Sequence, residues 1–140
     1  MTALEFLERI TLAERNLEAA RDREERYRCS MQRITSSLGG EHVSHSRNVT
    51  AQEDAIIRYM EAVEESNRLE IEKNSIIDAV ENAISHLKRD DFKIILRRIY
   101  IKHESVEDIA KDLFLHPKYV FSKRKMALHE LDQYLAKSPY

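Results

Sequence analysis

Apolar residues recur in alternating steps of three and four along the first part of the chain, which is the spacing of one face of an α-helix. Thr2 and Glu5 form a capping-box pattern directly before this stretch. We therefore expect a helix from Ala3 to about Ser36, roughly 50 Å long at ~1.5 Å per residue. Glu24 alone interrupts its apolar positions, which are Phe6, Ile10, Ala13, Leu17, Ala20, Tyr27, Met31, Ile34 and Leu38.

A second stretch repeats these steps after Thr50 and Glu53, another capping pair. Between the two stretches lies a predicted loop, about residues 37–50, which contains both glycines of the chain. This connection favours a long antiparallel, coiled-coil-like hairpin. The positions of the second stretch are Ile56, Tyr59, Val63, Ser66, Glu70, Lys73, Ile77, Val80, Ile84 and Leu87, widened by Met60, Leu69, Ile71 and Ile76.

The middle of this hairpin seam is polar, with Glu24, Ser66, Glu70 and Lys73 at similar heights. Half-buried polar groups of this kind set register or oligomeric state at a cost in stability. A two-helix hairpin alone buries little apolar surface, so we expect a homo-oligomer, with a dimer of hairpins favoured.

The segment from Ser105 to Leu131 has the pattern of two short helices joined by a tight turn. Ser105 is a predicted N-cap, with Asp108 three positions later, so the first of these helices begins near Val106. Val106, Ile109, Ala110 and Leu113 share one face of it. Pro117 predicts the start of the second helix, because proline suits a first helical turn.

Positive charge dominates this second helix, since no Asp or Glu occurs from Leu113 to His129. The pattern is typical of a helix-turn-helix, whose second helix enters the major groove of DNA while basic side chains neutralise phosphates. A solvated basic face, or a docking face for an acidic protein, is the alternative. The candidate DNA-binding residues are Lys118, Tyr119, Phe121, Ser122, Lys123, Arg124 and Lys125, with Arg97 and Arg98 as backbone contacts.

These residues resemble the fourth conserved region of bacterial sigma factors. In that region a helix containing Ile-Leu-Arg precedes Ser-x-Glu-(Glu/Asp)-Ile-Ala-x-x-Leu, a turn, and a helix ending in Ala-Leu-x-x-Leu. The matching positions are Ile95, Leu96, Arg97, Arg98, Ile99, Tyr100, Ser105, Glu107, Asp108, Ile109, Ala110, Leu113, Val120, Ala127, Leu128 and Leu131. With its helical front part the chain is similar to small phage and prophage transcriptional regulators, including the ArpU-like ones. The resemblance implies promoter DNA and RNA polymerase as partners.

Two positions depart from that pattern. Phe114 stands in the turn where the family commonly has Gly, so either the turn uses other dihedrals or Phe114 fills an apolar gap. Lys123 stands where many relatives bury an aliphatic residue, so either the helix is rotated or Lys123 snorkels to solvent.

Composition and charge fit a two-part, all-α protein. The chain of 140 residues has only two Gly, two Pro and no Trp against 34% charged residues, which is helix-rich usage. Residues 1–87, the predicted hairpin domain, carry 11 basic and 17 acidic residues and so net −6. Residues 88–140, the predicted sigma-like domain, carry 12 and 8 and so net +4. The basic half favours nucleic acid as its partner.

No motif for catalysis, a cofactor or a metal is present. Cys29, His42 and His45 lack the further donors that a zinc site needs, and the chain has no phosphate-binding loop or hydrolase signature. We expect a protein that is not an enzyme. The single cysteine, the lack of a secretory leader and the lack of a long apolar run predict a cytoplasmic protein without membrane contact.

The favoured prediction is therefore a DNA-binding transcriptional regulator of bacteriophage type that acts in a bacterial host cell. The alternative is a protein-interaction adaptor or inhibitor that engages RNA polymerase or another host complex.

Overall fold

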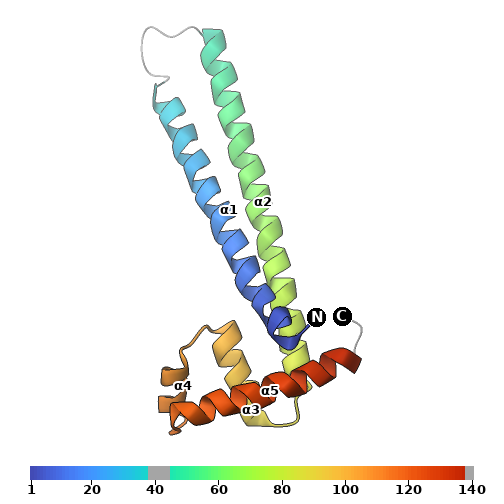
Figure 1. Ribbon diagram of the computed structural model, residues 1–140. Helices are drawn as coiled ribbons and strands as arrows, with labels where there is room; N and C mark the ends of the chain where they lie inside the picture. The colour runs from blue at the N-terminus through green and yellow to red at the C-terminus, as the bar shows by residue number, and fades with distance from the viewer. Residues whose placement is uncertain (38–44, 138–140) are drawn as a thin grey trace. The chain divides into compact units, whose positions relative to one another are not determined.

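The computed structural model describes residues 1–37 and 45–137, with side chains for all of these except residues 35–37 and 45–48. All regular structure in these residues is helical, so the protein is all-α, as predicted. The elements are α1 (Ala3–Ser37), α2 (His45–Ser85), α3 (Asp90–Leu96), the π-helix η1 (Arg97–Ile101), α4 (Val106–Asp112) and α5 (Pro117–Lys137) (Figure 1).

The chain forms two compact units, and α1 and α2 each contribute to both. Unit 1 comprises Met1–Ala13 and Lys73–Tyr140, and unit 2 comprises Glu14–Glu72. The sequence predicted a boundary between residues 87 and 88. Unit 1 differs from that division because the apolar ends of α1 and α2 share a core with the helices that follow them.

The predicted capping box at the start of α1 is confirmed. The backbone N–H of Thr2 donates to Glu5 Oε2 over 3.0 Å, and the N–H of Glu5 donates to Thr2 Oγ1 over 3.2 Å. The next amide, of Ala3, donates to Asp132 Oδ1 on α5. The first turn of α1 is thereby fixed both within itself and to the last helix of unit 1.

Unit 1 has two apolar clusters. In the smaller one, Ile95 of α3 packs with Ile109 and Ala110 of α4 and Val120 of α5. Full burial of a side chain of this size stabilises a fold by about 2 kcal/mol. Helices as short as α3 and α4 are not stable in isolation, so burial in the two clusters stabilises them. The larger cluster consists of Ala3, Phe6, Leu7, Ile10, Val80, Ala83, Ile84, Leu87, Phe92, Leu96, Ala127 and Leu131.

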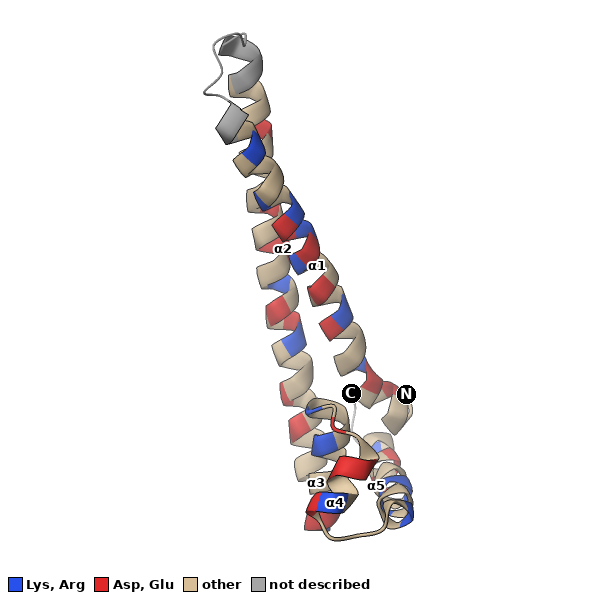
Figure 2. Ribbon diagram, turned by 90° about the vertical axis from the view of Figure 1, so that its left-hand side faces the viewer, with Lys and Arg blue, Asp and Glu red and all other residues tan. Residues whose placement is uncertain are grey.

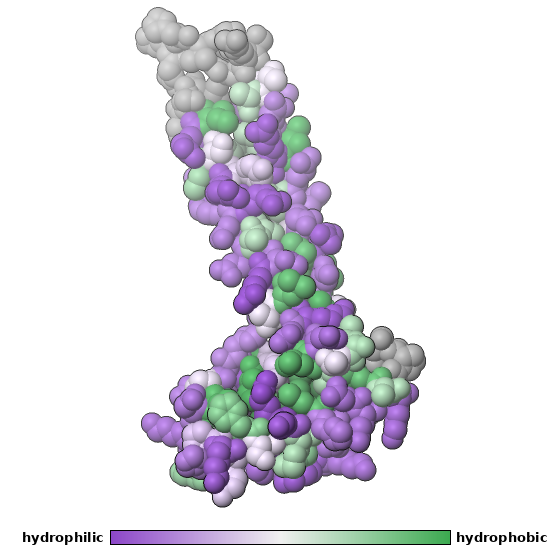
Figure 3. Space-filling model, in the orientation of Figure 1, coloured by the Kyte–Doolittle hydropathy of each residue, from purple (hydrophilic) through white to green (hydrophobic). Residues whose placement is uncertain are grey.

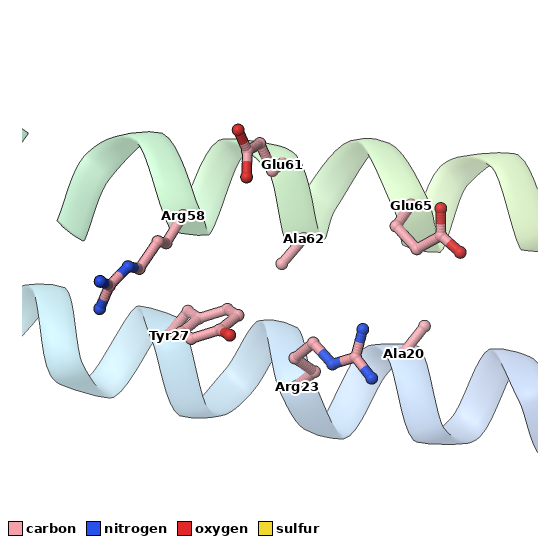
Figure 4. Close-up of a pocket in the computed structure, with 7 residues that line it drawn as sticks. All are labelled: Ala20, Arg23, Tyr27, Arg58, Glu61, Ala62 and Glu65. Carbon is pink, nitrogen blue, oxygen red and sulfur yellow. The ribbon is translucent and has the colours of Figure 1, made fainter. Parts of the chain in front are cut away.

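In unit 2 the antiparallel helices meet through small side chains. Leu17 and Ala20 of α1 are buried, as are Ala55, Ala62 and Ser66 of α2. The alanines leave a cavity of about 290 Å³ between the helices, lined by arginine and glutamate side chains (Figure 4). The small side chains therefore leave part of the seam in unit 2 unfilled.

Two observations bear on the polar residues predicted in this seam. Glu70 pairs across the hairpin with Arg21, with an N–O distance of 3.2 Å. Ser66 is buried, and its Oγ has no hydrogen-bond partner among the described residues. A polar seam is thus present, but Arg21, which the sequence analysis did not include, supplies its cross-helix charge.

The predicted loop and the predicted start of the second helix are wrong in part. α2 begins at His45, so Thr50 and Glu53 lie inside the helix and do not cap it. Residues 38–44, including Leu38 and the two glycines, lie outside the described residues. The seam of α2 is also shifted: Ile56 is exposed, and its neighbour Ala55 is buried instead.

None of the helices in the described residues combines the length and the apolar character that a membrane span requires. The space-filling view shows apolar side chains as separate green groups among purple ones along the long helices (Figure 3).

Candidate nucleic-acid interface

The first helix of the candidate interface, α4, begins where its sequence predicts. Ser105 has an extended backbone, and its Oγ accepts from the N–H of Asp108 over 3.2 Å, which is the N-cap contact. Ile109 and Ala110 are buried, while Glu107 and Asp108 are exposed. One face of α4 therefore packs in the smaller apolar cluster of unit 1, and acidic side chains on the opposite face are exposed to solvent.

The turn after α4 is a Schellman motif with Phe114 in the left-handed position. The N–H of Leu115 donates to Ala110 O over 2.8 Å, and the N–H of Phe114 donates to Lys111 O over 3.3 Å. Phe114 has a φ of 56°, and its side chain is 95% exposed. The backbone thus keeps the turn that usually takes Gly, and the Phe114 ring fills no gap between the helices.

α5 begins at Pro117, as predicted, and His116 caps it. The ring Nδ1 of His116 accepts from the N–H of Lys118 over 3.2 Å, and its carbonyl accepts from the N–H of Tyr119 over 2.9 Å. Val120, Ala127 and Leu131 are buried along one face of α5. This face fixes the rotation of the helix and so determines which side chains point to solvent.

The opposite face of α5 is basic. Lys118, Ser122 and Lys125 follow one another at helical spacing and are exposed, with Tyr119 and Phe121 on either side at about half exposure. Within the described part of the chain, no acidic side chain forms an ion pair with Lys118 or Lys125. Lys118 Nζ lies 5.5 Å from the centroid of the Tyr119 ring. Lys and Arg gather on α5, and Asp and Glu on α4 (Figure 2).

Lys123, a predicted DNA contact, points inward to Asp91 of α3. Its Nζ lies 2.5 Å from Asp91 Oδ2, and both side chains are less than one-third exposed. Burial raises the pKa of Asp91, but the hydrogen bond and charge of Lys123, together with Arg89, outweigh it and leave the pKa of this carboxyl below its ordinary value of 3.8. Lys123 therefore joins α5 to α3 and is not part of the exposed face.

Arg98 is also engaged within the protein. Its Nε lies 2.7 Å from Glu104 Oε2, and its Nη2 contacts Glu104 and Asp112. The hydrogen bonds to Glu104 and then Asp112 raise the pKa of Arg98 above its ordinary value. The same hydrogen bond from Arg98 lowers the pKa of Glu104. This cluster joins η1 to α4 and to the segment between them.

The other two cations, Arg97 and Arg124, also have partners within unit 1. Arg97 Nε donates to Glu81 Oε2 over 3.1 Å. Arg124 Nε donates to the Tyr100 hydroxyl over 2.9 Å. Of the nine predicted site residues, the structure therefore brings Lys118, Tyr119, Phe121, Ser122 and Lys125 together on one surface. It directs Lys123, Arg124, Arg97 and Arg98 to partners inside unit 1.

His129 also belongs to the exposed line of α5, and the sequence analysis did not include it. It lies four residues after Lys125 and is exposed. The spacing 118, 122, 125 and 129 could have identified it, because each step of three or four residues keeps to one helix face.

No group of three or more His, Cys, Asp or Glu side chains in the described residues is placed to hold a metal ion. Of the residues weighed as ligands, Cys29 is half-buried with its Sγ 3.7 Å from Glu25 Oε1. His42 and the side chain of His45 lie outside the described residues.

Comparison of this chain with the models of known protein families, with curated proteins and with solved structures finds no match.

Proposed function

We propose that this protein binds double-stranded DNA and acts as a transcriptional regulator of bacteriophage type. In this proposal α4, the turn and α5 act as a helix-turn-helix, with α5 in the major groove. The observation that carries the proposal is the exposed line of Lys118, Ser122 and Lys125 on a helix that has no acidic residue before Glu130. Such a line meets a surface of closely spaced phosphates without like-charge repulsion.

Each residue of the exposed line has a role that follows from its place on α5. Lys118 and Ser122 lie in the first turns, so they reach base edges. There a lysine donates hydrogen bonds to guanine, and a serine hydroxyl can donate to or accept from a base. Lys125 lies a turn further on and neutralises a phosphate. Tyr119 and Phe121 flank the line and offer apolar surface to thymine methyl groups. The protein would act by binding alone, without a chemical step.

The four internal cations support this surface and do not contact DNA in the proposal. Lys123 and Arg124 hold α5 against α3 and η1, and Arg97 and Arg98 hold η1 itself. These pairs keep the rotation of α5 fixed before DNA arrives, so less conformational entropy is lost on binding.

A second candidate function is docking on a protein such as RNA polymerase, which the resemblance to sigma factors implies. The observation that favours it is exposed aromatic surface. Phe114, Tyr119 and Phe121 are all at least half exposed, and aromatic side chains are enriched at the centres of protein interfaces.

We also propose that the protein forms a dimer through α2. Ile57, Met60 and Ile71 are more than half exposed and lie on the side of α2 away from the buried Ala55 and Ala62. Exposed apolar side chains on one face of a long helix are the kind that a second hairpin covers in a four-helix bundle.

The test of DNA binding reverses two charges on the exposed line. We expect Lys118→Glu with Lys125→Glu to abolish binding to DNA from the promoter region next to the chain's own coding sequence, because two attractions become repulsions. Arg26→Glu with Arg33→Glu reverses two exposed charges in unit 2 and is expected to keep most of the affinity. Fluorescence anisotropy measures binding, and circular dichroism checks the fold of each variant.

Salt dependence separates the two candidate functions. Binding to DNA releases counterions, so the affinity for DNA falls steeply with salt and gives a straight line in a plot of log K against log salt concentration.

Unchanged DNA binding by the folded Lys118→Glu, Lys125→Glu variant would contradict the proposal. Loss of polymerase binding on Phe114→Ala, with no DNA binding by the wild type, would support the protein-docking candidate instead.

A further inference from the structure

A basic groove lies in unit 1 beside the C-terminal half of α5. It has a volume of about 480 Å³ and is bounded on one side by the connection from α2 to α3 and on the other by α5. The charged and imidazole side chains that line it are His86, Lys88, Arg89, His129, Glu130 and Lys137.

The charges of this groove are not balanced. Glu130 is the one carboxylate among the lining residues, and its Oε1 already accepts from the backbone N–H of Lys88 over 2.9 Å. Arg89 is occupied by Asp91, with an N–O distance of 2.8 Å. Lys88 and Lys137 are exposed, and no described carboxylate forms an ion pair with either ammonium group. The groove therefore presents two available cations.

Besides these two cations, the groove contains a hydrogen-bond donor, which one of its two histidines supplies. His86 Nδ1 lies 2.7 Å from the carbonyl oxygen of Asn82, which can only accept, and its ring stacks on Tyr134 at 4.7 Å. His129 Nε2 lies 3.3 Å from Gln133 Nε2, an amide nitrogen that donates. The proton of a neutral His129 ring is then on Nδ1, which leaves this N–H to donate to a ligand.

The groove is continuous with the candidate interface through His129. This residue lines the groove and also ends the exposed line that runs from Lys118 through Lys125. A ligand that lies along α5 from its first turn therefore reaches the groove next.

We infer that this groove holds a backbone phosphate of the DNA bound along α5, an inference that rests on the proposed function. Lys88 and Lys137 supply the positive charge, and His129 donates a hydrogen bond to a phosphate oxygen. Ammonium groups suit this role, because lysine binds phosphate as a compact charge with freely rotating donors. The groove anchors the DNA backbone and carries no base specificity.

The experiment removes the two lysine charges with Lys88→Gln and Lys137→Gln. For the same promoter duplex we expect affinity to fall several-fold and the slope of log K against log salt to become shallower by about 0.9, the contribution of one phosphate. The matched control is Arg26→Gln with Arg33→Gln, which removes two exposed charges from unit 2 and is expected to keep the wild-type slope. Both lysines are exposed, so thermal unfolding of the variant should match that of the wild type.

The outcomes separate this inference from the proposed function. A wild-type slope and affinity in the Lys88→Gln, Lys137→Gln variant, with binding lost in Lys118→Glu, Lys125→Glu, would overturn the groove assignment alone. No DNA binding by the wild-type protein would overturn both. Titration with inorganic phosphate, followed by NMR at His129, distinguishes the source of the phosphate. Saturable binding of free phosphate that the promoter duplex does not displace would contradict the assignment to DNA.

Discussion

Phe114 combines two properties that rarely occur in one residue. Its backbone is in the left-handed region, where a residue with a β-carbon is strained by roughly 1–2 kcal/mol, and its ring is almost fully exposed. Burial of the ring therefore does not offset the strain. The exposed ring is thus the part of Phe114 that would act in the second candidate function, docking on a protein.

We expect Phe114→Gly to raise the free energy of unfolding by about 1 kcal/mol, because glycine adopts this φ without strain. Phe114→Ala keeps the β-carbon and removes only the exposed ring, so it should leave the stability unchanged. Urea unfolding of the two variants measures the difference. Equal stabilisation by both substitutions would show that the ring, and not the backbone, is the source of the strain.

The surroundings of Lys123 could not be predicted from its own segment. The sequence showed a lysine where an apolar residue was expected, and left open whether the helix rotates or the side chain snorkels. In the structure the helix keeps its rotation, with Val120 and Ala127 buried, and Lys123 reaches Asp91, 32 residues earlier. A partner so distant in sequence is fixed by tertiary packing, which local spacing does not encode.

Among the helices, those with chemical start signals were predicted most accurately. The starts of α1, α4 and α5 are marked by Thr2, Ser105 and Pro117. Thr2 and Ser105 precede their helices and pair an otherwise free amide, whereas Pro117 is a first residue that has no amide hydrogen. Thr50 carried the same signal inside α2, where the helix had already begun at His45. The π-helix η1 was not predicted, because the apolar spacing around it is read equally well as an α-helix.

The link between α3 and α5 makes the stability of unit 1 depend on pH. The pKa of Asp91 is lower in the folded state than its ordinary value of 3.8, and that of Glu104 is also lowered from 4.5. For an acid with a lowered pKa, the stabilisation is fully present above the ordinary value and is lost as the pH falls through the folded value.

We therefore expect the protein to lose stability as the pH falls below about 4, and the Asp91→Asn variant to lose about 1 kcal/mol less than the wild type over the same range. Asp90→Asn, which removes the neighbouring exposed carboxylate, is the control and should follow the wild type. Urea midpoints measured from neutral to acidic pH give the comparison. A parallel pH dependence of Asp91→Asn and the wild type would contradict the role of the Lys123 pair.

At the scale of the whole molecule, the two parts of the chain carry net charges of opposite sign. The basic α5 is the part that would meet DNA, whereas the acidic hairpin sequence repels it. Self-association through Ile57, Met60 and Ile71 of α2 would place two α5 helices on one assembly, which suits a palindromic site.

We expect Ile57→Ser with Ile71→Ser to shift the protein from dimer to monomer in sedimentation equilibrium, because the substitutions remove apolar area from the proposed interface. Leu12→Ser removes an apolar side chain that is similarly exposed on α1, and it should leave the mass unchanged. A wild-type protein that sediments as a monomer at every concentration would exclude the dimer.

The hydrogen bond from the Ala3 amide to Asp132 joins residues 129 positions apart. The larger core of unit 1 likewise combines Phe6 and Leu7 with Ala127 and Leu131. During synthesis, this core cannot close until α5 has left the ribosome, so the apolar side chains at the start of α1 lack part of their cover until then. The helix that carries the surface proposed to bind DNA thus also completes the core in which the first turns of α1 are buried.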